Sequence, residues 1–309
     1  MNSRKTLILF EQIETFEQFL ARNIILKNVE VSTPYKEVSN IVMHNIRAVS
    51  KRLPVNFVHE LWLERWSKAL SEYDNIIIFD NAITPKLLEY IKSHLTTDTK
   101  LKIWLWNIPN EHIDYLTKNY DVYCFDKTYS EKYHLKFIDQ FYILDTVQEQ
   151  ESVNNSQVDF YFVGADKGRL SRIETLAKTI EDSGYSYHFD VMSETSKSQF
   201  QGIHFLDEFL TYNDVIKNIQ ASNVIVELNK DGQDGLTLRS LESIFYNKKL
   251  ITNNINIVNY DFYHPNNILV WDENEDSDLK DFMDKPYIPL EEKIIKKYSF
   301  GQWLKKITE

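Results

Sequence analysis

No glycine occurs before position 164 of this 309-residue chain, and the whole sequence contains only seven. Average usage of about 7% would give roughly twenty. Glycine lets the backbone approach a phosphate closely, as in the G-x-G-x-x-G and Walker phosphate-binding turns. The first half therefore cannot contain either turn. Any nucleotide held by a glycine loop is expected in the second half.

Charge and cysteine content exclude several classes of protein. The chain has 35 basic and 46 acidic residues, which gives a net charge of −11. Because neutralising phosphates requires an excess of Lys and Arg, we expect no nucleic-acid partner. The single cysteine, Cys124, excludes a disulfide framework and a cysteine metal cluster. The sequence shows neither a long apolar span nor a secretory cleavage signal, so we expect a cytoplasmic protein.

The polar stretch 147–157 (VQEQESVNNSQ) divides the chain into two halves, with a boundary near residue 152. On both sides, short apolar runs alternate with segments of helical periodicity. Such alternation predicts βαβ crossovers and parallel sheets, and hence two α/β domains. The expected strands are 6–10, 75–79, 101–105, 122–125, 159–163, 185–191, 223–228, 249–252 and 268–271.

Two helices have clear start or stop signals, whereas the segment 11–70 is ambiguous. Thr84 is a good N-cap and Pro85 suits a first helical turn, so a helix is predicted to begin there. Apolar spacing predicts a helix after residue 169, ended by Ser183-Gly184. Further helices are expected over 38–49 and 57–70.

Two strand-to-helix turns in the second half hold four of the seven glycines. The first is 163–169 (VGADKGR), with Gly164 and Gly168 beside Lys167 and Arg169. Ligands of open parallel sheets bind at the carboxyl ends of strands, and a helix N-terminus offers free N–H groups to an anion. This turn is therefore a candidate anion site. The alternative is a plain turn in which the glycines serve geometry and the charges are solvated.

The second turn, 229–242 (NKDGQDGLTLRSLE), also follows a buried strand and leads into a helix. Gly232 and Gly235 free the backbone there. Thr237 offers a hydroxyl, and Arg239 offers a permanent cation.

Two carboxylates of this turn can serve one ligand. If the helix begins near Leu236, Asp234 lies in the preceding loop and Glu242 lies nearly two turns along the helix. A carboxylate accepts hydrogen bonds from two sugar hydroxyls, so both could line a sugar-bearing ligand. The alternatives are an exposed helix glutamate for Glu242 and a salt bridge for Arg239.

Residues 234–242 (DGLTLRSLE), followed by 247–253 (NKKLITN), resemble the donor-site signature of GT-B glycosyltransferases. In that signature an acidic residue and a glycine open a loop, and a glutamate follows after seven intervening residues. Asp234 stands where the family usually has glutamate, and the spacing to Glu242 matches. The turn 163–169 resembles the family's first C-domain strand and its basic turn. The likeness covers roughly residues 158–270.

The resemblance implies two Rossmann-like domains with parallel sheets facing across a cleft. Residues 1–152 would bind the acceptor and residues 153–290 the nucleotide sugar. A C-terminal helix within 291–309 would pack back toward the first domain. No metal and no bound cofactor are implied, because basic side chains and a helix N-terminus neutralise the diphosphate, and the nucleotide sugar is the donor substrate.

Roles for individual residues follow from the same resemblance. Glu242 would hold the ribose, and Asp234 with the Gly235 backbone would contact the donor sugar. Lys167 and Arg169 would neutralise the diphosphate. Arg239 would be either a second phosphate ligand or a cover for the helix surface. The expected donor-site residues are Gly164, Lys167, Arg169, Asp234, Gly235, Leu236, Thr237, Arg239 and Glu242.

The first half resembles the family only in architecture. If the reaction inverts, a general base must come from the acceptor side. Asp80 follows the run 75–79 and Asp126 follows the run 122–125, so both are catalytic candidates, together with Asp234 on the donor side. The alternative for Asp80 and Asp126 is capping of a helix or loop.

Together these observations predict a metal-independent glycosyltransferase with a saccharide or lipid-linked acceptor. Segment 120–127 (YDVYCFDK) resembles bacterial enzymes of lipopolysaccharide and capsule assembly, which implies a role in surface polysaccharide synthesis. The alternatives are a non-catalytic nucleotide- or sugar-binding α/β protein and a GT-B-type epimerase. The basic, amphipathic tail 293–306 could touch anionic lipid at the inner face of the membrane, although packing of a C-terminal helix is the plainer interpretation.

Overall fold

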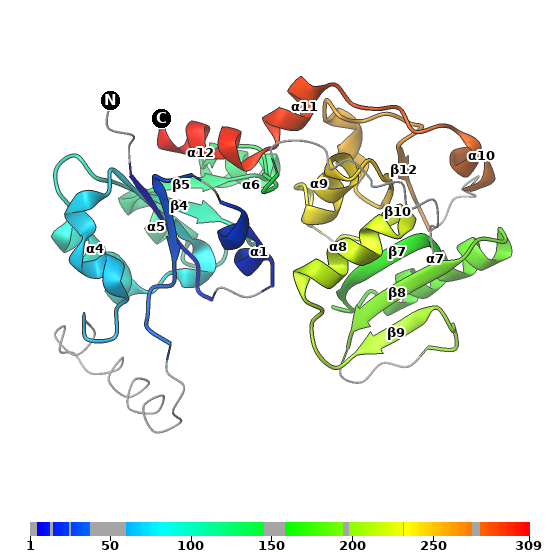
Figure 1. Cartoon of the computed structure of the whole chain (residues 1–309), viewed down its shortest axis with the longest axis horizontal. Coiled ribbons are helices and arrows are strands. Elements are labelled where there is room, and N and C mark those ends of the chain that lie inside the picture. Colours follow the sequence, from blue (N-terminus) through cyan, green and yellow to red (C-terminus); the bar gives the residue numbers. More distant parts are fainter. Residues whose placement is uncertain are drawn as a thin grey trace. The chain divides into compact units, whose positions relative to one another are not determined.

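The computed structural model describes residues 5–12, 15–24, 26–37, 60–144, 158–193, 198–230, 232–273 and 279–309. The chain divides into two compact units, Met1–Ile138 with Thr308, and Asp139–Ile307 with Glu309. Each unit contains one six-stranded sheet in which every pairing is parallel (Figure 1). The polar stretch 147–157 lies outside the described residues.

The first unit has the strand order β2-β1-β3-β4-β5-β6. Its central strand β3 (NIIIF) is buried along its whole length, as expected for a parallel sheet covered on both faces. The runs predicted at 6–10, 75–79, 101–105 and 122–125 correspond to β1, β3, β4 and β5. The elements are β1 (Thr6–Leu9), α1 (Thr15–Asn23), β2 (Val29–Ser32), η1 (Arg65–Lys68), η2 (Leu70–Glu72), β3 (Asn75–Phe79), η3 (Asp80–Ala82), α4 (Pro85–His94), β4 (Lys100–Leu105), α5 (Ile113–Asn119), β5 (Asp121–Cys124), α6 (Lys127–Tyr133) and β6 (Lys136–Phe137).

The predicted helix 38–49 lies outside the described residues. The helix predicted over 57–70 is wrong in its described part, where 3-10 turns replace it. Trp66 explains part of this difference. Its ring is buried, and its indole N–H donates to the carbonyl of Thr33 at 2.9 Å. These contacts hold the 3-10 turn η1 against the core.

Thr84 caps α4, and Pro85 occupies the first turn, as the sequence predicts. The Thr84 hydroxyl accepts a hydrogen bond from the Leu87 N–H at 3.2 Å.

Thr84→Ala is therefore expected to lower the free energy of unfolding by about 1 kcal/mol, measured by urea denaturation. Thr117→Ala, inside α5 of the same unit, is the control and should change it by less than about 0.5 kcal/mol. Equal losses in both variants would contradict the cap.

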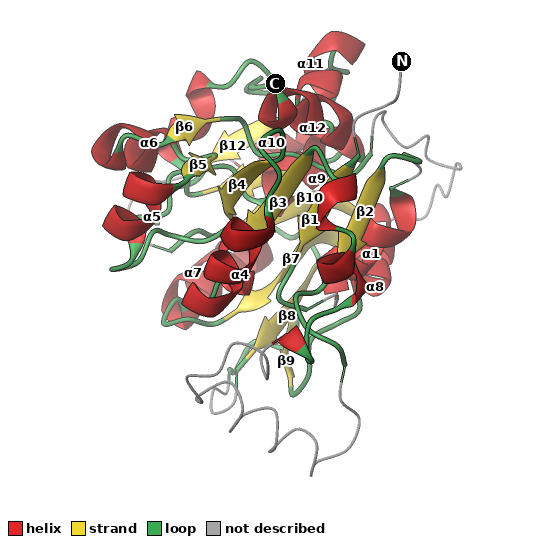
Figure 2. Ribbon diagram, turned by 90° about the vertical axis from the view of Figure 1, so that its left-hand side faces the viewer, coloured by secondary structure: helices red, strands yellow, loops and turns green. Residues whose placement is uncertain are grey.

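The second unit has the strand order β12-β11-β10-β7-β8-β9. The chain builds outward from β7 to β9 and then returns to the other side of β7 with β10, so the strand order reverses between β7 and β10. Figure 2 shows the strands in yellow and the connecting helices in red. The elements are β7 (Val158–Ala165), α7 (Leu170–Asp182), β8 (Tyr187–Met192), β9 (Ile203–Leu206), α8 (Tyr212–Gln220), β10 (Ser222–Glu227), α9 (Leu238–Phe245), β11 (Lys249–Thr252), η4 (Ile255–Asn259), β12 (Ile268–Val270), α10 (Leu279–Asp284), α11 (Glu292–Lys297) and α12 (Phe300–Thr308).

The C-terminal helix α12 is held through its apolar face. The ring centroid of Trp303 lies 4.3 Å from that of Phe141. The backbone N–H of Tyr142 donates to the carbonyl of Tyr298 at 2.8 Å, just before the helix begins. Phe300, Trp303, Leu304 and Ile307 are all buried. The amphipathic face noted in the sequence is therefore used for packing.

Candidate functional site

The two glycine-containing turns meet at the switch point of the second sheet. Turn 163–169 follows β7, and the turn beyond residue 227 follows β10. These two strands are neighbours, with Val224 opposite Phe160, at the position where the strand order reverses. In open α/β sheets, ligands bind in the crevice beyond the carboxyl ends of the strands at this point. The strand order thus brings together two turns that the sequence predicts separately.

Arg169 ties the two turns together. Its guanidinium donates to the carbonyl of Leu228 beyond β10, and to the carbonyls of Ala165 at 2.7 Å and Asp166 at 3.3 Å in its own turn. Gly164 makes room for this arrangement, because a Cβ there would lie 3.1 Å from Arg169 Nη2 and 3.2 Å from the Phe162 ring. Arg169 therefore holds the geometry of the turns. Its expected contact with a diphosphate remains a prediction.

Lys167 and Lys230 are two cations of the candidate site whose ammonium groups form no ion pair with the described residues. Lys167 lies in its turn with a left-handed φ of 49°, and Lys230 follows β10. Both side chains are exposed, and neither has a hydrogen-bond or ion-pair partner among the residues that the structure describes. Burial, followed by the charges of Lys230 and Arg169, lowers the pKa of Lys167. Cations that repel one another in this way are stabilised by an anion placed between them.

Lys230 is a candidate site residue that the sequence patterns did not single out. It stands in a polar stretch (NKDGQDG) where a charged residue is ordinary. Only the adjacency of β7 and β10 brings it close enough to Lys167 to help lower the pKa of that residue.

Glu227 is a buried carboxylate that organises the second turn. It ends β10 and is 2% exposed. Its Oε1 accepts hydrogen bonds from the hydroxyls of Thr237 and of Ser240, the latter at 2.7 Å, and its Oε2 accepts one from Thr252. These contacts fasten the start of α9 to the ends of β10 and β11. Glu227 is the one charged residue in an otherwise apolar run (NVIVEL), which is the sequence signal that could have identified it.

Glu242 lies in the interior of the unit. Its side chain is 0% exposed, and its Oε2 lies 2.5 Å from Arg239 Nη1. Its Oε1 accepts a hydrogen bond from the Tyr212 hydroxyl, which lies 2.9 Å from the hydroxyl of Tyr142. Burial raises the pKa of Glu242 to about 7, and the charge of Arg239 opposes that rise. We call Glu242, Arg239, Tyr212 and Tyr142 the Glu242 cluster.

This burial corrects one expectation and confirms another. The alternative of an exposed helix glutamate is wrong, because every residue of α9 from Ser240 to Phe245, Glu242 included, is buried. The alternative of a salt bridge for Arg239 is confirmed. Both carboxylate oxygens of Glu242 contact protein groups, so the ribose contact implied by the resemblance remains a prediction.

The remaining donor-site residues differ in what they present. Asp234 is half-buried, and its carboxylate has no partner among the described residues, while its backbone carbonyl accepts from Asn254 Nδ2 at 3.2 Å. Gly235 and Leu236 are buried. Thr237 is the N-cap of α9 and is engaged by Glu227 and by the Arg239 N–H. Asp234 is thus the candidate with a free polar side chain.

Asp80 and Asp126 lie at the carboxyl ends of β3 and β5, on either side of β4 in the first sheet. Asp80 accepts hydrogen bonds from the backbone N–H groups of Trp106 and Asn107, each at 3.1 Å, and burial raises its pKa. Asp126 caps α6 through the Tyr129 N–H at 3.1 Å. The capping alternative is confirmed for both residues, and their catalytic role remains a prediction.

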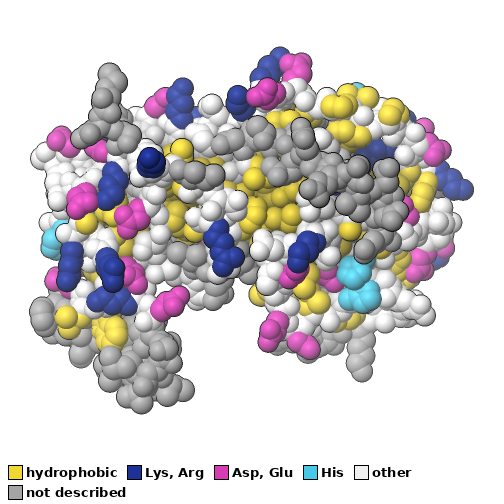
Figure 3. Space-filling model, viewed as in Figure 1, with side chains coloured by type: hydrophobic (Ala, Val, Ile, Leu, Met, Phe, Trp, Pro, Cys, Tyr) yellow, Lys and Arg dark blue, Asp and Glu magenta, His cyan; other side chains and the backbone are white. Residues whose placement is uncertain are grey.

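Within the described ranges, no three His, Cys, Asp or Glu side chains gather as metal ligands. No helix in those same ranges is long and apolar enough to cross a bilayer. On the face seen in Figure 3, Lys and Arg side chains (dark blue) lie among Asp and Glu side chains (magenta).

Comparison with solved structures identifies the fold. The chain matches a glycosyltransferase from Rickettsia africae with a TM-score of 0.53 and 12% identity, over 99% of this chain and 97% of that one. It also matches the apo form of the lipopolysaccharide outer core galactosyltransferase WaaB (TM-score 0.46, 12% identity, 99% and 98% covered) and S. aureus MnaA with UDP (0.46, 11%, 99% and 95%). The match with the Rickettsia africae enzyme has the highest TM-score of these three and gives the fold. No protein family and no curated protein matches the sequence.

The fold is that of the GT-B glycosyltransferases, as the resemblance of the donor-site motifs implies. Two α/β units with six-stranded parallel sheets confirm the predicted fold class.

Proposed function

We propose that this chain is a glycosyltransferase that moves a sugar from a nucleotide-sugar donor to a saccharide or lipid-linked acceptor. The observation that carries this proposal is the convergence of two glycine-containing turns on the switch point of the second sheet. Lys167 and Lys230 stand on these turns with uncommitted ammonium groups, within the part of the chain that the structure describes. The GT-B fold over nearly the whole chain supports the proposal.

In the proposed reaction, Lys167 and Lys230 hold the diphosphate of the donor. The bond between the anomeric carbon and the diphosphate oxygen breaks, and negative charge develops on the leaving diphosphate. Ammonium groups already in place stabilise that charge without reorganisation, so the scheme needs no metal. Asp234 accepts hydrogen bonds from hydroxyls of the donor sugar.

The acceptor hydroxyl forms the new bond to the anomeric carbon and loses its proton to a base. We propose Asp80 or Asp126 for this role, since each ends a strand of the first sheet. Both carboxylate oxygens of Asp80 accept backbone N–H groups, whereas Asp126 accepts one from the described residues through Oδ1 alone, so Asp126 can receive the acceptor proton at Oδ2 without losing its cap.

We propose surface polysaccharide synthesis as the setting, on the resemblance of segment 120–127. A peripheral membrane contact would use exposed basic side chains of α11 and α12, because the apolar face of α12 is already buried.

A non-catalytic nucleotide-binding protein is the second candidate. The observation that favours it is the burial of Glu242, whose oxygens contact Arg239 and Tyr212 rather than an open site. A chain that keeps the anion site but lacks an accessible ribose ligand would bind nucleotides without transferring sugar.

Turnover separates these candidates. We expect the chain to release free nucleotide from a nucleotide sugar, slowly with water and faster with the right acceptor. The measurement is chromatographic detection of UDP, GDP, ADP and CMP from the corresponding sugar nucleotides. Binding without release would indicate the non-catalytic candidate. Conversion of the sugar without release of nucleotide would indicate an epimerase.

A further inference from the structure

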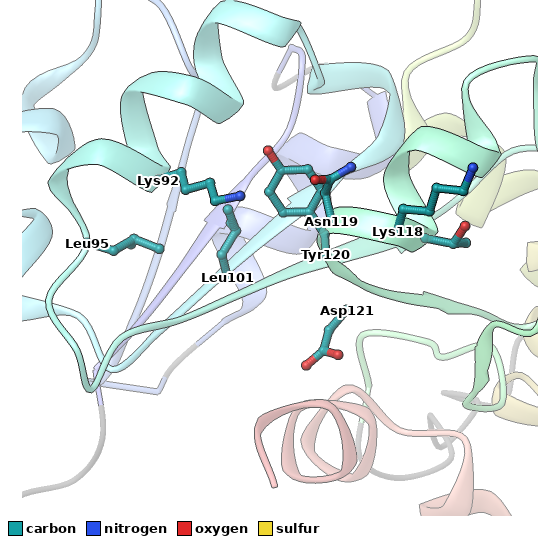
Figure 4. A pocket seen from close by; sticks show the side chains of 8 residues that line it. Lys92, Leu95, Leu101, Lys118, Asn119, Tyr120 and Asp121 are labelled. Atoms are coloured by element: carbon teal, nitrogen blue, oxygen red, sulfur yellow. The ribbon is translucent and has the colours of Figure 1, made fainter.

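A pocket of about 420 Å³ lies in the first unit, at the amino-terminal edge of β4 and β5 (Figure 4). The carboxyl ends of these strands, near Asp80 and Asp126, belong to the opposite edge of the sheet. The pocket walls come from the ends of α4 and α5 and from the starts of β4 and β5. Its volume falls within the range of small-molecule sites, about 300–1,000 Å³.

Two ammonium groups line this pocket without an ion-pair partner in the described ranges. Lys92 points from the last turn of α4 toward the ring of Tyr120, with Nζ 5.6 Å from the ring centroid. Figure 4 shows Lys118, from α5, on the other side of that ring. The carboxylate of Asp121 lies 2.7 Å from Lys136 Nζ and is neutralised by it. The pocket therefore carries net positive charge in a chain whose net charge is −11.

The same pocket has an apolar wall. Leu101 and the Tyr120 ring supply carbon surface beside Lys92, and Leu95 lies on the other side of that lysine. The Asn119 side chain donates to the Tyr115 carbonyl at 2.8 Å, which leaves its amide oxygen available as an acceptor. Burial is the main cause that raises the pKa of Tyr120 to about 12, so its phenol is neutral at physiological pH. A sugar ring matches this combination, because it presents a C–H face for the wall and hydroxyls for the polar groups.

We propose that this pocket binds an acidic saccharide, whose carboxylate contacts Lys92 in the positive field of Lys118, while its ring lies against the apolar wall. An inorganic anion would use the cations and leave the apolar wall uncovered. A neutral sugar would cover the wall and leave both cations unmatched. The pocket belongs to a different unit from the donor site, and the inference holds whether or not the chain transfers sugars.

Equilibrium binding to the full chain tests the ligand class. The probes are D-glucuronate, D-glucose and inorganic phosphate at constant ionic strength, followed by calorimetry and by chemical shifts of the protein. We expect glucuronate to bind in the millimolar range, and glucose to bind at least about tenfold more weakly. Phosphate should not displace glucuronate. Phosphate binding as tightly as glucuronate, or glucose binding equally well, would overturn the proposal.

The variant Lys92→Ala/Lys118→Ala tests the location. It should weaken glucuronate binding about tenfold. Lys27→Ala/Lys68→Ala removes the same charge from exposed positions of the same unit outside the pocket and should leave binding unchanged. Lys92 and Lys118 also lie in the last turns of their helices, where cations offset the helix dipole. If that is their only role, the pocket variant will lose stability but keep glucuronate binding, which would overturn the proposal.

Discussion

Arg239→Met is expected to lower the free energy of unfolding by about 3–5 kcal/mol, because it leaves a buried carboxylate without its partner. The Glu242 side chain is 0% exposed and lies 2.5 Å from the Arg239 guanidinium, and the hydroxyl of Tyr212 alone does not replace that charge. Methionine keeps much of the volume of the arginine stem, so the loss reports the ion pair more than a cavity. Urea denaturation followed by circular dichroism measures it.

Arg172→Met is the matched control. Arg172 forms a partly exposed ion pair with Glu273 at 3.5 Å in the same unit, and its loss should change stability by at most about 1 kcal/mol. The double variant Arg239→Met/Glu242→Leu removes both buried charges and should regain most of the loss. Equal losses from Arg239→Met and Arg172→Met would contradict the importance of the Glu242 cluster.

Lys167→Ala/Lys230→Ala is expected to lower the affinity for a nucleoside diphosphate about 100-fold, and each single change about tenfold. Each single change would remove one of the proposed charge-assisted contacts to the diphosphate, and the double change would remove both. Calorimetric titration with the nucleotide that the protein prefers gives the affinities. The control, Lys178→Ala/Lys217→Ala, removes two exposed lysines from the helices α7 and α8 of the same unit. Each of these lysines forms an ion pair with an aspartate of its own helix. Full affinity in Lys230→Ala would exclude Lys230 from the site.

The alternation of apolar runs with helical periodicity was enough to predict the fold class and the strands β3, β7, β10 and β11. The order of those strands was not predictable, because the neighbours of β7 are set by pairings with segments 27 and 64 residues away. The strand β9 (IHFL) was missed because it is a short edge strand with partly exposed residues, which lacks a clear alternation.

The candidate site was predictable only in part for a similar reason. The sequence places glycines and cations after two strands, but the adjacency of the turns depends on the sheet order. Apolar spacing in α9 marks Leu241, Ile244 and Phe245 as its buried face and leaves the flank that carries Glu242 outside it. That flank is also covered, by Tyr212 of α8 and by Tyr142, which is 70 residues earlier in the chain than Tyr212.

The central claim is that the two turns beyond β7 and β10 form a nucleotide-binding site. Thermal denaturation of the intact chain with UDP, GDP, ADP and CMP tests it most directly, because a ligand that binds only the folded state raises the melting temperature. We predict that at least one nucleotide raises it in the parent chain and in Lys178→Ala/Lys217→Ala, but not in Lys167→Ala/Lys230→Ala. No shift with any nucleotide, or the same shift in both double variants, would contradict the claim.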